Sequence, residues 1–383
     1  MKEMLYGKTI DGLREVAASV GMPRHAAGQM ARWLYKRGVT ETDAMTDISA
    51  AHRAALAERF EVGLRSPVRA TVSADGTAKY LFALDGGAGR NADSELNSHS
   101  MVEAVVIPDN GRADENGGRD GARATLCVSS QAGCRMGCAF CATGRQGLQR
   151  DLTPGEILNQ FASLPGRRAD GEKRESTDAG TARPWEWLTN IVYMGMGEPL
   201  DNPDAVLASL EVLTSEWGYG WSPSRITVST AGVAPALERF LASTRAHLAV
   251  SLHNPFADER AAIMPIERAY PVEGIVETLR RYPFEPQRRV SFEYIVMSGL
   301  NDSPRHIAGL VKLLGELSCR LNLIRFHKIP DSPFFSPPLE AMERMRDTLS
   351  RRGIRTTIRA SRGEDIEAAC GLLSTGACVS GNF

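Results

Sequence analysis

Short apolar runs alternate with amphipathic helical stretches from residue 124 to the C-terminus, and this alternation constrains the fold more than any other feature. Strands separated by helical stretches predict a parallel sheet with crossover helices, and hence an α/β barrel, open or closed. Active residues of such barrels gather at the C-terminal ends of the strands. We expect strands at 125–129, 190–194, 225–230, 247–252, 290–296, 321–326 and 355–359.

The part of the chain before the barrel has a different pattern. Residues 9–60 predict three short helices, the first capped by Thr9 and stopped by Gly21. Strands at 68–72 and 78–84 are joined by Asp75-Gly76, a hairpin signal, and 101–107 predicts another strand. The polar stretches 86–100, 109–121 and 166–183 predict surface loops. We therefore divide the chain into a helical domain (1–65), a linker region with the hairpin and insertions (66–121) and the barrel (122–383).

Composition excludes several classes of protein. The chain is 43% hydrophobic and 24% charged, with a net charge of −1, so a nucleic-acid partner would have to bind local patches. No apolar run reaches the about 18 residues of a membrane span, and the N-terminus lacks a signal peptide, which predicts a cytoplasmic protein without membrane contact. Seven cysteines in a reducing compartment indicate metal ligation or catalysis.

Three cysteines follow the first expected barrel strand with C-x3-C-x2-C spacing: Cys134, Cys138 and Cys141. Three thiolates in one loop can bind three irons of a cubane cluster and leave the fourth iron open to a small molecule. The alternative is a structural zinc ion with a fourth ligand from Cys127 or a histidine, but the second C-x2-C pair typical of such sites is missing.

A glycine-rich turn, Met194-Gly195-Met196-Gly197-Glu198-Pro199, follows the second expected strand. Glycine lets the backbone approach a ligand closely, and Glu198 can accept hydrogen bonds from an ammonium group. Taken alone, such a turn is an ordinary loop about as often as a binding site. Its place at the end of a barrel strand favours a binding site.

With Phe140 before the last cysteine, the motif resembles the signature of the radical S-adenosylmethionine (SAM) superfamily. Several further segments resemble the RlmN family of adenine C2-methyltransferases. The resemblance implies a partial (β/α) radical SAM barrel with a small N-terminal helical domain, and an adenosine of 23S rRNA (in several bacteria also of the tRNA anticodon loop) as the substrate. The sister family, Cfr, methylates C8, and Pro199 favours the C2 type. The matching segments are 125–134 (TLCVSSQAGC), 251–253 (SLH), 322–324 (NLI) and 362–371 (RGEDIEAACG).

The resemblance also implies roles for single residues and two SAM molecules per turnover. Cys370 would be methylated by the first SAM, and a radical from the second would activate that methyl group for addition to adenine. Cys127 would release the product by forming a disulfide with Cys370, and Glu103 would remove the C2 proton. From composition alone, Cys127 would be a buried hydrophobe, Cys370 a structural residue and Glu103 an exposed strand carboxylate.

The resemblance also implies which residues of this chain would contact SAM. His327 departs from the family, in which the best-known members carry asparagine, because an imidazole can titrate and cannot mimic an amide. We expect Cys319 to belong to the core, and we assign Cys378 no role. The expected SAM contacts are Gly197, Glu198, Ser229, Ser251, Leu252, His253 and His327.

Arginines concentrate at 344–362 and at 280–289, and the N-terminal region adds His25, Arg32, Lys36 and Arg37. Such charges are more often solvated surface, but an RNA-modifying enzyme needs them for phosphates. We expect a monomer that acts on 23S rRNA and also on tRNA, with an external electron donor such as a flavodoxin. The rival from another class is a nonenzymatic iron–sulfur or zinc RNA-binding protein.

Overall fold

The computed structural model describes residues 2–84, 101–109, 123–166 and 183–374. The expected loops at 86–100, 109–121 and 166–183 lie outside these residues except at positions 109, 166 and 183, and Cys378 lies outside them as well. A ten-stranded sheet forms the centre, in the order β14-β13-β12-β11-β10-β9-β6-β5-β4-β3. Its strands are β3 (Arg69–Val72), β4 (Ala78–Ala83), β5 (Met101–Asp109), β6 (Arg123–Cys127), β9 (Asn190–Tyr193), β10 (Ile226–Thr230), β11 (His247–Ser251), β12 (Val290–Val296), β13 (Arg320–Arg325) and β14 (Arg355–Arg359).

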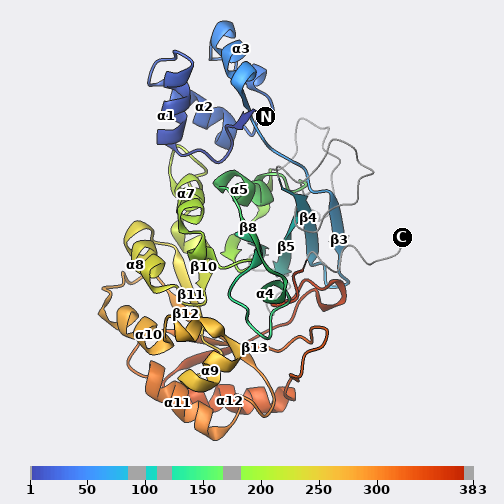
Figure 1. Ribbon diagram of the computed structural model, residues 1–383, viewed down its shortest axis with the longest axis vertical. Helices are drawn as coiled ribbons and strands as arrows, with labels where there is room; N and C mark the ends of the chain where they lie inside the picture. The colour runs from blue at the N-terminus through green and yellow to red at the C-terminus, as the bar shows by residue number, and fades with distance from the viewer. Residues whose placement is uncertain (1, 85–100, 110–122, 167–182, 375–383) are drawn as a thin grey trace, which may run out of the picture.

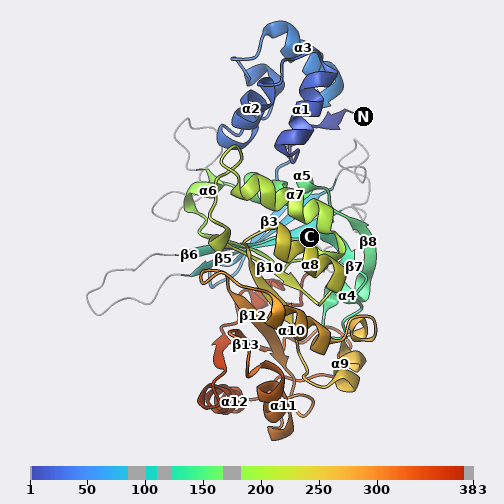
Figure 2. The same ribbon diagram turned by 90° about the vertical axis from the view of Figure 1, so that its left-hand side faces the viewer.

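All seven expected barrel strands are present within a few residues of their predicted bounds, and β6 and β9 to β14 pair in parallel. The expected hairpin is β3–β4, which together with β5 extends this sheet by antiparallel pairing. The helices of the barrel follow one another around its outside (Figures 1 and 2). They are α5 (Pro154–Ala162), α6 (Pro184–Trp187), α7 (Pro203–Thr214), α8 (Ala234–Ser243), α9 (Ala257–Ile263), α10 (Val272–Arg281), α11 (Pro304–Leu314) and α12 (Leu339–Arg351).

Side chains alternate between the two faces of a strand, so the register shows which residues share a face. On one face, strands β9 to β13 place apolar side chains such as Ile191, Leu248 and Phe292, all of which are buried. The other face, which we call the inner face, carries most of the polar candidates. They are Glu103, Cys127, Ser229, Ser251, Glu293, Asn322 and Arg359.

The sheet is strongly curved. Arg359 on β14 and Met194 directly after β9 belong to strands that are five positions apart in the sheet order. Nevertheless, the Arg359 guanidinium lies 3.8 Å from the Met194 sulfur. The inner face is therefore the concave face of an open barrel, and side chains from its two sides meet across it.

Residues 2–62, which we call the N-terminal module, contain the three expected helices, α1 (Ile10–Ser19), α2 (Ala26–Ala31) and α3 (Ala50–Arg59). Thr9 caps α1 by accepting a hydrogen bond from Gly12, as expected, and a π-helical turn at Arg32–Lys36 extends α2. A short parallel pair, β1 (Glu3–Met4) with β2 (Phe60–Glu61), joins the two ends of the module. The module lies at one end of the barrel, over α5 and α7 (Figures 1 and 2).

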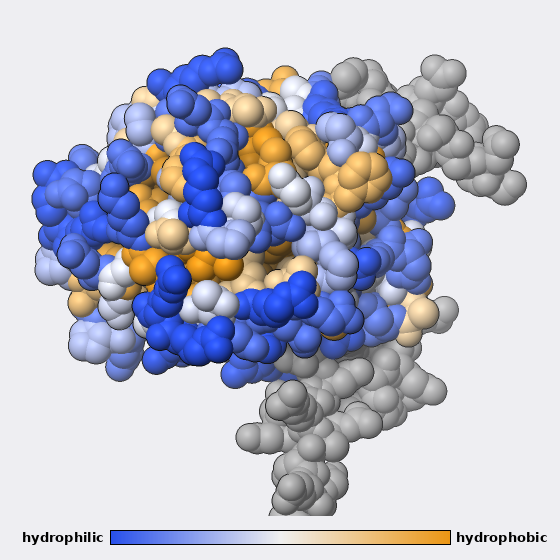
Figure 3. Space-filling model, turned by 90° about the horizontal axis from the view of Figure 1, so that it is seen from below, coloured by the Kyte–Doolittle hydropathy of each residue, from blue (hydrophilic) through white to orange (hydrophobic). Residues whose placement is uncertain are grey.

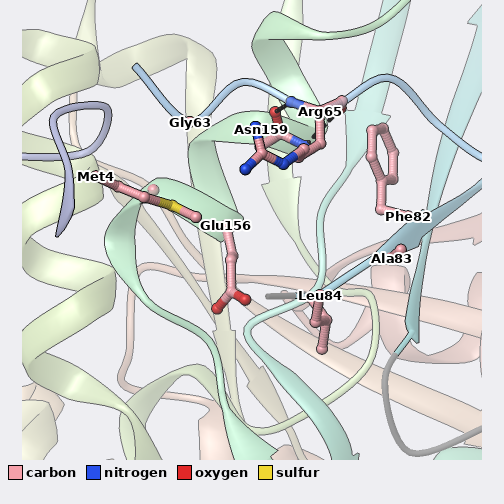
Figure 4. A pocket seen from close by; sticks show the side chains of 9 residues that line it. Met4, Gly63, Arg65, Phe82, Ala83, Leu84, Glu156 and Asn159 are labelled. Carbon is pink, nitrogen blue, oxygen red and sulfur yellow. Dashed lines mark hydrogen bonds between the residues drawn. The ribbon is translucent and has the colours of Figure 1, made fainter. Parts of the chain in front are cut away.

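The contact between module and barrel is close. Just beyond the end of the module, the backbone of Arg65 is held by Asn159 on α5, which accepts a hydrogen bond from its N–H and donates one to its carbonyl, each at 2.9 Å (Figure 4). The gap beside them, between Met4, β4 and α5, has a volume of only about 10 Å³. The hydroxyl groups of Tyr6, in the module, and Tyr219, in the barrel, form a hydrogen bond of 2.5 Å. None of the helices in the described ranges is long and apolar enough to cross a membrane.

Candidate active site

The three motif cysteines lie in one tight loop, residues 134–144, which we call the cluster loop. Cys134 ends β7 (Gln131–Cys134), which pairs with β8 (Gly147–Asp151), and Cys141 is the N-cap of α4 (Ala142–Gln146). Gly133 has a φ of +70°, and a Cβ there would lie 1.9 Å from a backbone oxygen. A Cβ on Gly144 would lie 3.0 Å from the backbone nitrogen of Cys138. Only glycine at these positions lets the loop close on itself.

The thiols of this loop influence one another. Burial raises the pKa of Cys134 to about 12, and it raises the pKa of Cys138 well above its usual value, with further increases from Cys141 and Cys134. Three thiols that repel one another when ionised need positive charge between them, which iron would supply. Among the described residues, no three His, Cys, Asp or Glu side chains converge on a single ion. A cubane cluster does not require that, because its cysteines bind different irons, so the donor set fits a [4Fe–4S] cluster.

Glu198 lies beside this loop. Its buried carboxylate accepts hydrogen bonds from the backbone N–H groups of Ala231 at 2.7 Å and Leu200 at 2.9 Å. Burial raises the pKa of Glu198 to about 7. At Gly197, which has a φ of +97°, a Cβ would lie 2.6 Å from Gln131, so the turn requires glycine. A buried carboxylate in this setting is stabilised by a ligand ammonium group, which the amino group of SAM can provide.

His253 and Phe140 connect the cluster loop to β11. The His253 Nδ1 accepts a hydrogen bond from the backbone N–H of Ile295 at 2.9 Å, and the ring meets Phe140 edge-on, with centroids 4.7 Å apart. Burial lowers the pKa of His253 to about 3, so the ring is neutral and Nε2 carries its hydrogen. The neighbouring Leu252 is buried, and Ser251 and Ser229 lie on the inner face.

His327 is buried just after the end of β13. Its Nδ1 is 3.3 Å from the carboxylate of Glu364, and its Nε2 is 3.4 Å from the Ser361 hydroxyl. Burial lowers the pKa of His327, although Glu364 acts in the opposite direction. Because both ring nitrogens have partners, His327 would have to exchange one of them to contact SAM.

Cys127, on the inner face, lies close enough to Cys370 for the charges of the two thiols to interact. Cys127 is buried at the end of β6, and burial raises its pKa to about 12, with a further increase from Cys370. The Cys370 side chain reaches solvent, yet enough protein surrounds its thiol for desolvation to raise its pKa. The Arg359 charge acts in the opposite direction on both thiols. Two thiols far apart in the chain are thus both within range of the charge of one guanidinium.

The segment that carries Cys370 is hydrogen-bonded directly to the cluster loop. The carbonyl of Gly371 accepts a hydrogen bond from the backbone N–H of Ala142 at 2.8 Å. The Thr143 hydroxyl donates to the carbonyl of Leu373 at 2.6 Å. Cys370 is therefore held next to the place where a cluster and its ligand would bind.

Glu103 is buried, which excludes the exposed strand carboxylate considered above. Its Oε1 lies 3.0 Å from the ammonium group of Lys79, and its Oε2 accepts a hydrogen bond from the backbone N–H of Ser374 at 3.0 Å. The expectation that every candidate lies at the C-terminal end of a strand is wrong for Glu103, which lies near the start of β5. Because β5 runs antiparallel to β6, the start of β5 meets the same edge of the sheet.

Sequence reasoning missed several residues of this site. Arg359 appeared only as one of many surface arginines, and Lys79 had no role. Arg288, grouped with possible RNA contacts, is buried and donates to the carbonyls of Ala246 and Leu241, so it belongs to the core. Arg260 is also buried. Burial of a single arginine leaves no pattern in a sequence, and the position of Arg359 depends on the curvature of the sheet.

The comparisons with known proteins agree with this site. A solved structure described as a radical SAM methyltransferase from Sphaerobacter thermophilus aligns with 97% of this chain and 99% of its own, at 38% identity and a TM-score of 0.78. The fold and the site therefore define a radical SAM methyltransferase. Residues 4–62 match the model of the ribosomal RNA large subunit methyltransferase N-terminal domain.

Full-length relatives identify the family. A probable dual-specificity RNA methyltransferase RlmN from Parabacteroides distasonis is 48% identical over 98% of this chain and 97% of the relative. The dual-specificity RNA methyltransferase RlmN from Syntrophotalea carbinolica is 39% identical over 97% of this chain and 90% of its own length. The chain belongs to the RlmN family.

Proposed function

We propose that this protein methylates C2 of an adenosine in 23S rRNA, and of an adenosine in the tRNA anticodon loop, through a methylcysteine at Cys370. The observation that carries this proposal is that Cys127 and Cys370 lie close enough for their charges to interact with each other and with Arg359, and that Glu103 shares the inner face with Cys127. An ordinary methyltransferase needs no pair of cysteines. The names of the relatives support RNA as the substrate.

Cys134, Cys138 and Cys141 would hold the cluster, and Glu198 would bind the amino group of SAM. When bound, the two cofactors supply a radical that removes a hydrogen atom from the methyl group on Cys370. This route suits the target, because the electron-poor C2 of adenine does not attack the methyl group of SAM. The Cys370 methylene then forms a bond to C2, which gives a covalent link between protein and RNA.

Release of the product needs two further residues. Glu103, fixed by Lys79, takes the proton from C2, and the unpaired electron of the adduct would pass back to the cluster, which leaves a closed-shell adduct. The Cys127 sulfur then attacks the Cys370 sulfur, and the bond between Cys370 and the methylene breaks with its electron pair leaving on the carbon, which is protonated. The resulting disulfide must be reduced by an external thiol before the next turnover, and the cluster needs an external one-electron donor such as a flavodoxin.

One surface of the barrel suits a nucleic acid strand. A groove of about 510 Å³ runs between β14 and α12 and is lined by Arg325, Arg346, Arg359 and the exposed Leu339. Guanidinium groups bind phosphates, and an apolar side chain can contact an unstacked base. Apolar residues also lie exposed among hydrophilic ones on the lower side of the molecule (Figure 3). In the N-terminal module, Arg37 stacks on Trp33 at 4.2 Å and adds a second cationic position.

Product analysis tests the proposal. The enzyme, reconstituted without oxygen, should convert a 23S rRNA fragment and an unmodified tRNA to RNA that contains 2-methyladenosine, measured by nuclease digestion and mass spectrometry. 8-Methyladenosine would instead assign the Cfr reaction. A protein with an intact cluster that methylates neither RNA would refute RNA methylation.

A further inference from the structure

Glu293 is a buried carboxylate on the inner face for which the steps above have no use. It lies in the middle of β12 and is 4% exposed. Its Oε1 accepts hydrogen bonds from the Ser291 hydroxyl at 3.0 Å and from the amide of Asn322 at 2.8 Å. Asn322 is held in turn by the Thr357 hydroxyl at 2.7 Å. One oxygen of Glu293 is therefore fixed by a row of side chains from three adjacent strands.

The other oxygen has no such partner. In the described part of the chain, Glu293 Oε2 is buried and makes no hydrogen bond. The Arg359 Nε forms an ion pair with this oxygen at 3.9 Å, which is beyond hydrogen-bonding distance. Leaving a buried charged acceptor unsatisfied is costly, so an oxygen of this kind needs an explanation such as a missing ligand.

The position of Glu293 Oε2 in the barrel indicates which kind of ligand would bind it. The charge of Arg359, whose Nε is 3.9 Å from Glu293, also acts on Cys370, and the charge of Glu293 is close enough to Cys370 to raise the pKa of that thiol. Whatever nucleobase is bonded to the Cys370 methylene must lie in the same part of the barrel. The Arg359 side chain is 42% exposed, so it can move outward to the RNA when a base enters.

We propose that Glu293 Oε2 accepts a hydrogen bond from the exocyclic N6 amino group of the target adenine, and so selects adenine. This inference rests on the proposed function. The N6 amino group is the only hydrogen-bond donor on the base of an adenosine. Guanine has an acceptor oxygen at the equivalent position, which would face the carboxylate and be repelled. Fixation of Oε1 by Ser291 and Asn322 would hold Oε2 in position for this contact.

A double-mutant cycle between enzyme and RNA tests this contact. Glu293→Gln is compared with the wild type on two RNAs that carry adenosine or purine riboside, which lacks the N6 amino group, at the target position. On adenosine RNA the substitution should lower kcat/KM by roughly 10- to 100-fold, as expected for a hydrogen bond to a charged group. On purine riboside RNA the same substitution should change kcat/KM by no more than about threefold.

The controls separate this role from a structural one and from SAM binding. Ser291→Ala removes one hydrogen bond to Oε1 but leaves Oε2 in place, so it should retain more activity on adenosine RNA than Glu293→Gln. Reductive cleavage of SAM without RNA should stay within about twofold of the wild type in Glu293→Gln.

Equal losses on the two RNAs would overturn the contact with N6. A parallel loss of SAM cleavage would place Glu293 in the SAM pocket and would also overturn it. The proposed function is tested separately, by whether the wild type methylates adenosine RNA. That methylation can be observed even when the double-mutant cycle fails. A wild type that methylates no RNA would refute both.

Discussion

The buried pair of Arg260 and Glu267 allows the most detailed prediction about stability. Arg260 on α9 is 0% exposed and forms an ion pair with Glu267, which is 3% exposed. Its guanidinium also donates to three backbone carbonyls: Leu252 at 3.0 Å, Ala231 at 2.9 Å and Ser251 at 2.8 Å. These carbonyls lie at or just after the ends of β10 and β11. Arg260 therefore holds together the strand ends that carry the expected SAM contacts.

Replacement of Arg260 by methionine should be strongly destabilising. It removes three hydrogen bonds and leaves Glu267 buried without its cation, which costs about 3 to 5 kcal/mol. At about 2 to 4 °C per kcal/mol, the melting temperature should fall by roughly 8 to 16 °C for a loss near 4 kcal/mol. The double variant Arg260→Met/Glu267→Leu removes both charges, so its loss should be smaller than the sum of the two single losses.

The assay is thermal unfolding followed by circular dichroism, with the cluster in the same state in every variant. Arg305→Met is the matched control. Arg305, on α11, pairs with Glu259, which lies on α9 next to Arg260, but the Arg305 side chain is 60% exposed. Its loss should stay below about 1 kcal/mol. A fall of less than about 2 °C for Arg260→Met, or additive losses in the double variant, would show that the pair does not support the site as argued.

Four further predictions concern the cysteines and the module contact. Cys370→Ala should abolish methyl transfer to RNA but leave reductive SAM cleavage largely intact, and loss of both would point to misfolding. Cys127→Ala should accumulate protein covalently joined to RNA on denaturing gels. In the wild type, release of that adduct should accelerate up to tenfold per pH unit between pH 7 and 9, because the Cys127 pKa of about 12 keeps its thiolate scarce and the thiolate fraction grows with pH. A pH-independent release would argue against Cys127 as the attacking thiol. Gly155→Ala should destabilise the protein by about 1 to 3 kcal/mol, because its Cβ would lie 2.6 Å from the Tyr6 carbonyl oxygen, whereas Gly28→Ala, with nothing within 4 Å, should not.

The sequence predicts the elements of this fold well because its local signals agree with the tertiary structure. The apolar runs appear as β6 and β9 to β14, and the Asp75-Gly76 turn joins β3 to β4 as expected. The β7–β8 pair was missed, since residues 131–134 form a strand of mostly small residues inside the cysteine motif. Small and polar residues carry no period-2 signal, so only their pairing shows the strand.

The site was predictable where a motif lies in one segment, and less so where segments meet. The positions of Cys134, Cys138 and Cys141 in one loop follow from their spacing alone. The proximity of Lys79 to Glu103 depends on the register between β4 and β5. The approach of Arg359 to Cys127 depends on curvature accumulated over several strands, which no local pattern encodes.

The modification state of Cys370 tests the central claim most directly. Protein isolated from cells, with its cluster present, should give a peptide containing Cys370 that is heavier by one methyl group in mass spectrometry. That methyl group should be absent when Cys134 or Glu198 is replaced, because both belong to the site that would hold SAM. An unmodified Cys370 in protein with an intact cluster and available SAM would contradict the methylcysteine mechanism, and it would leave a radical SAM methyltransferase whose methyl group takes another route.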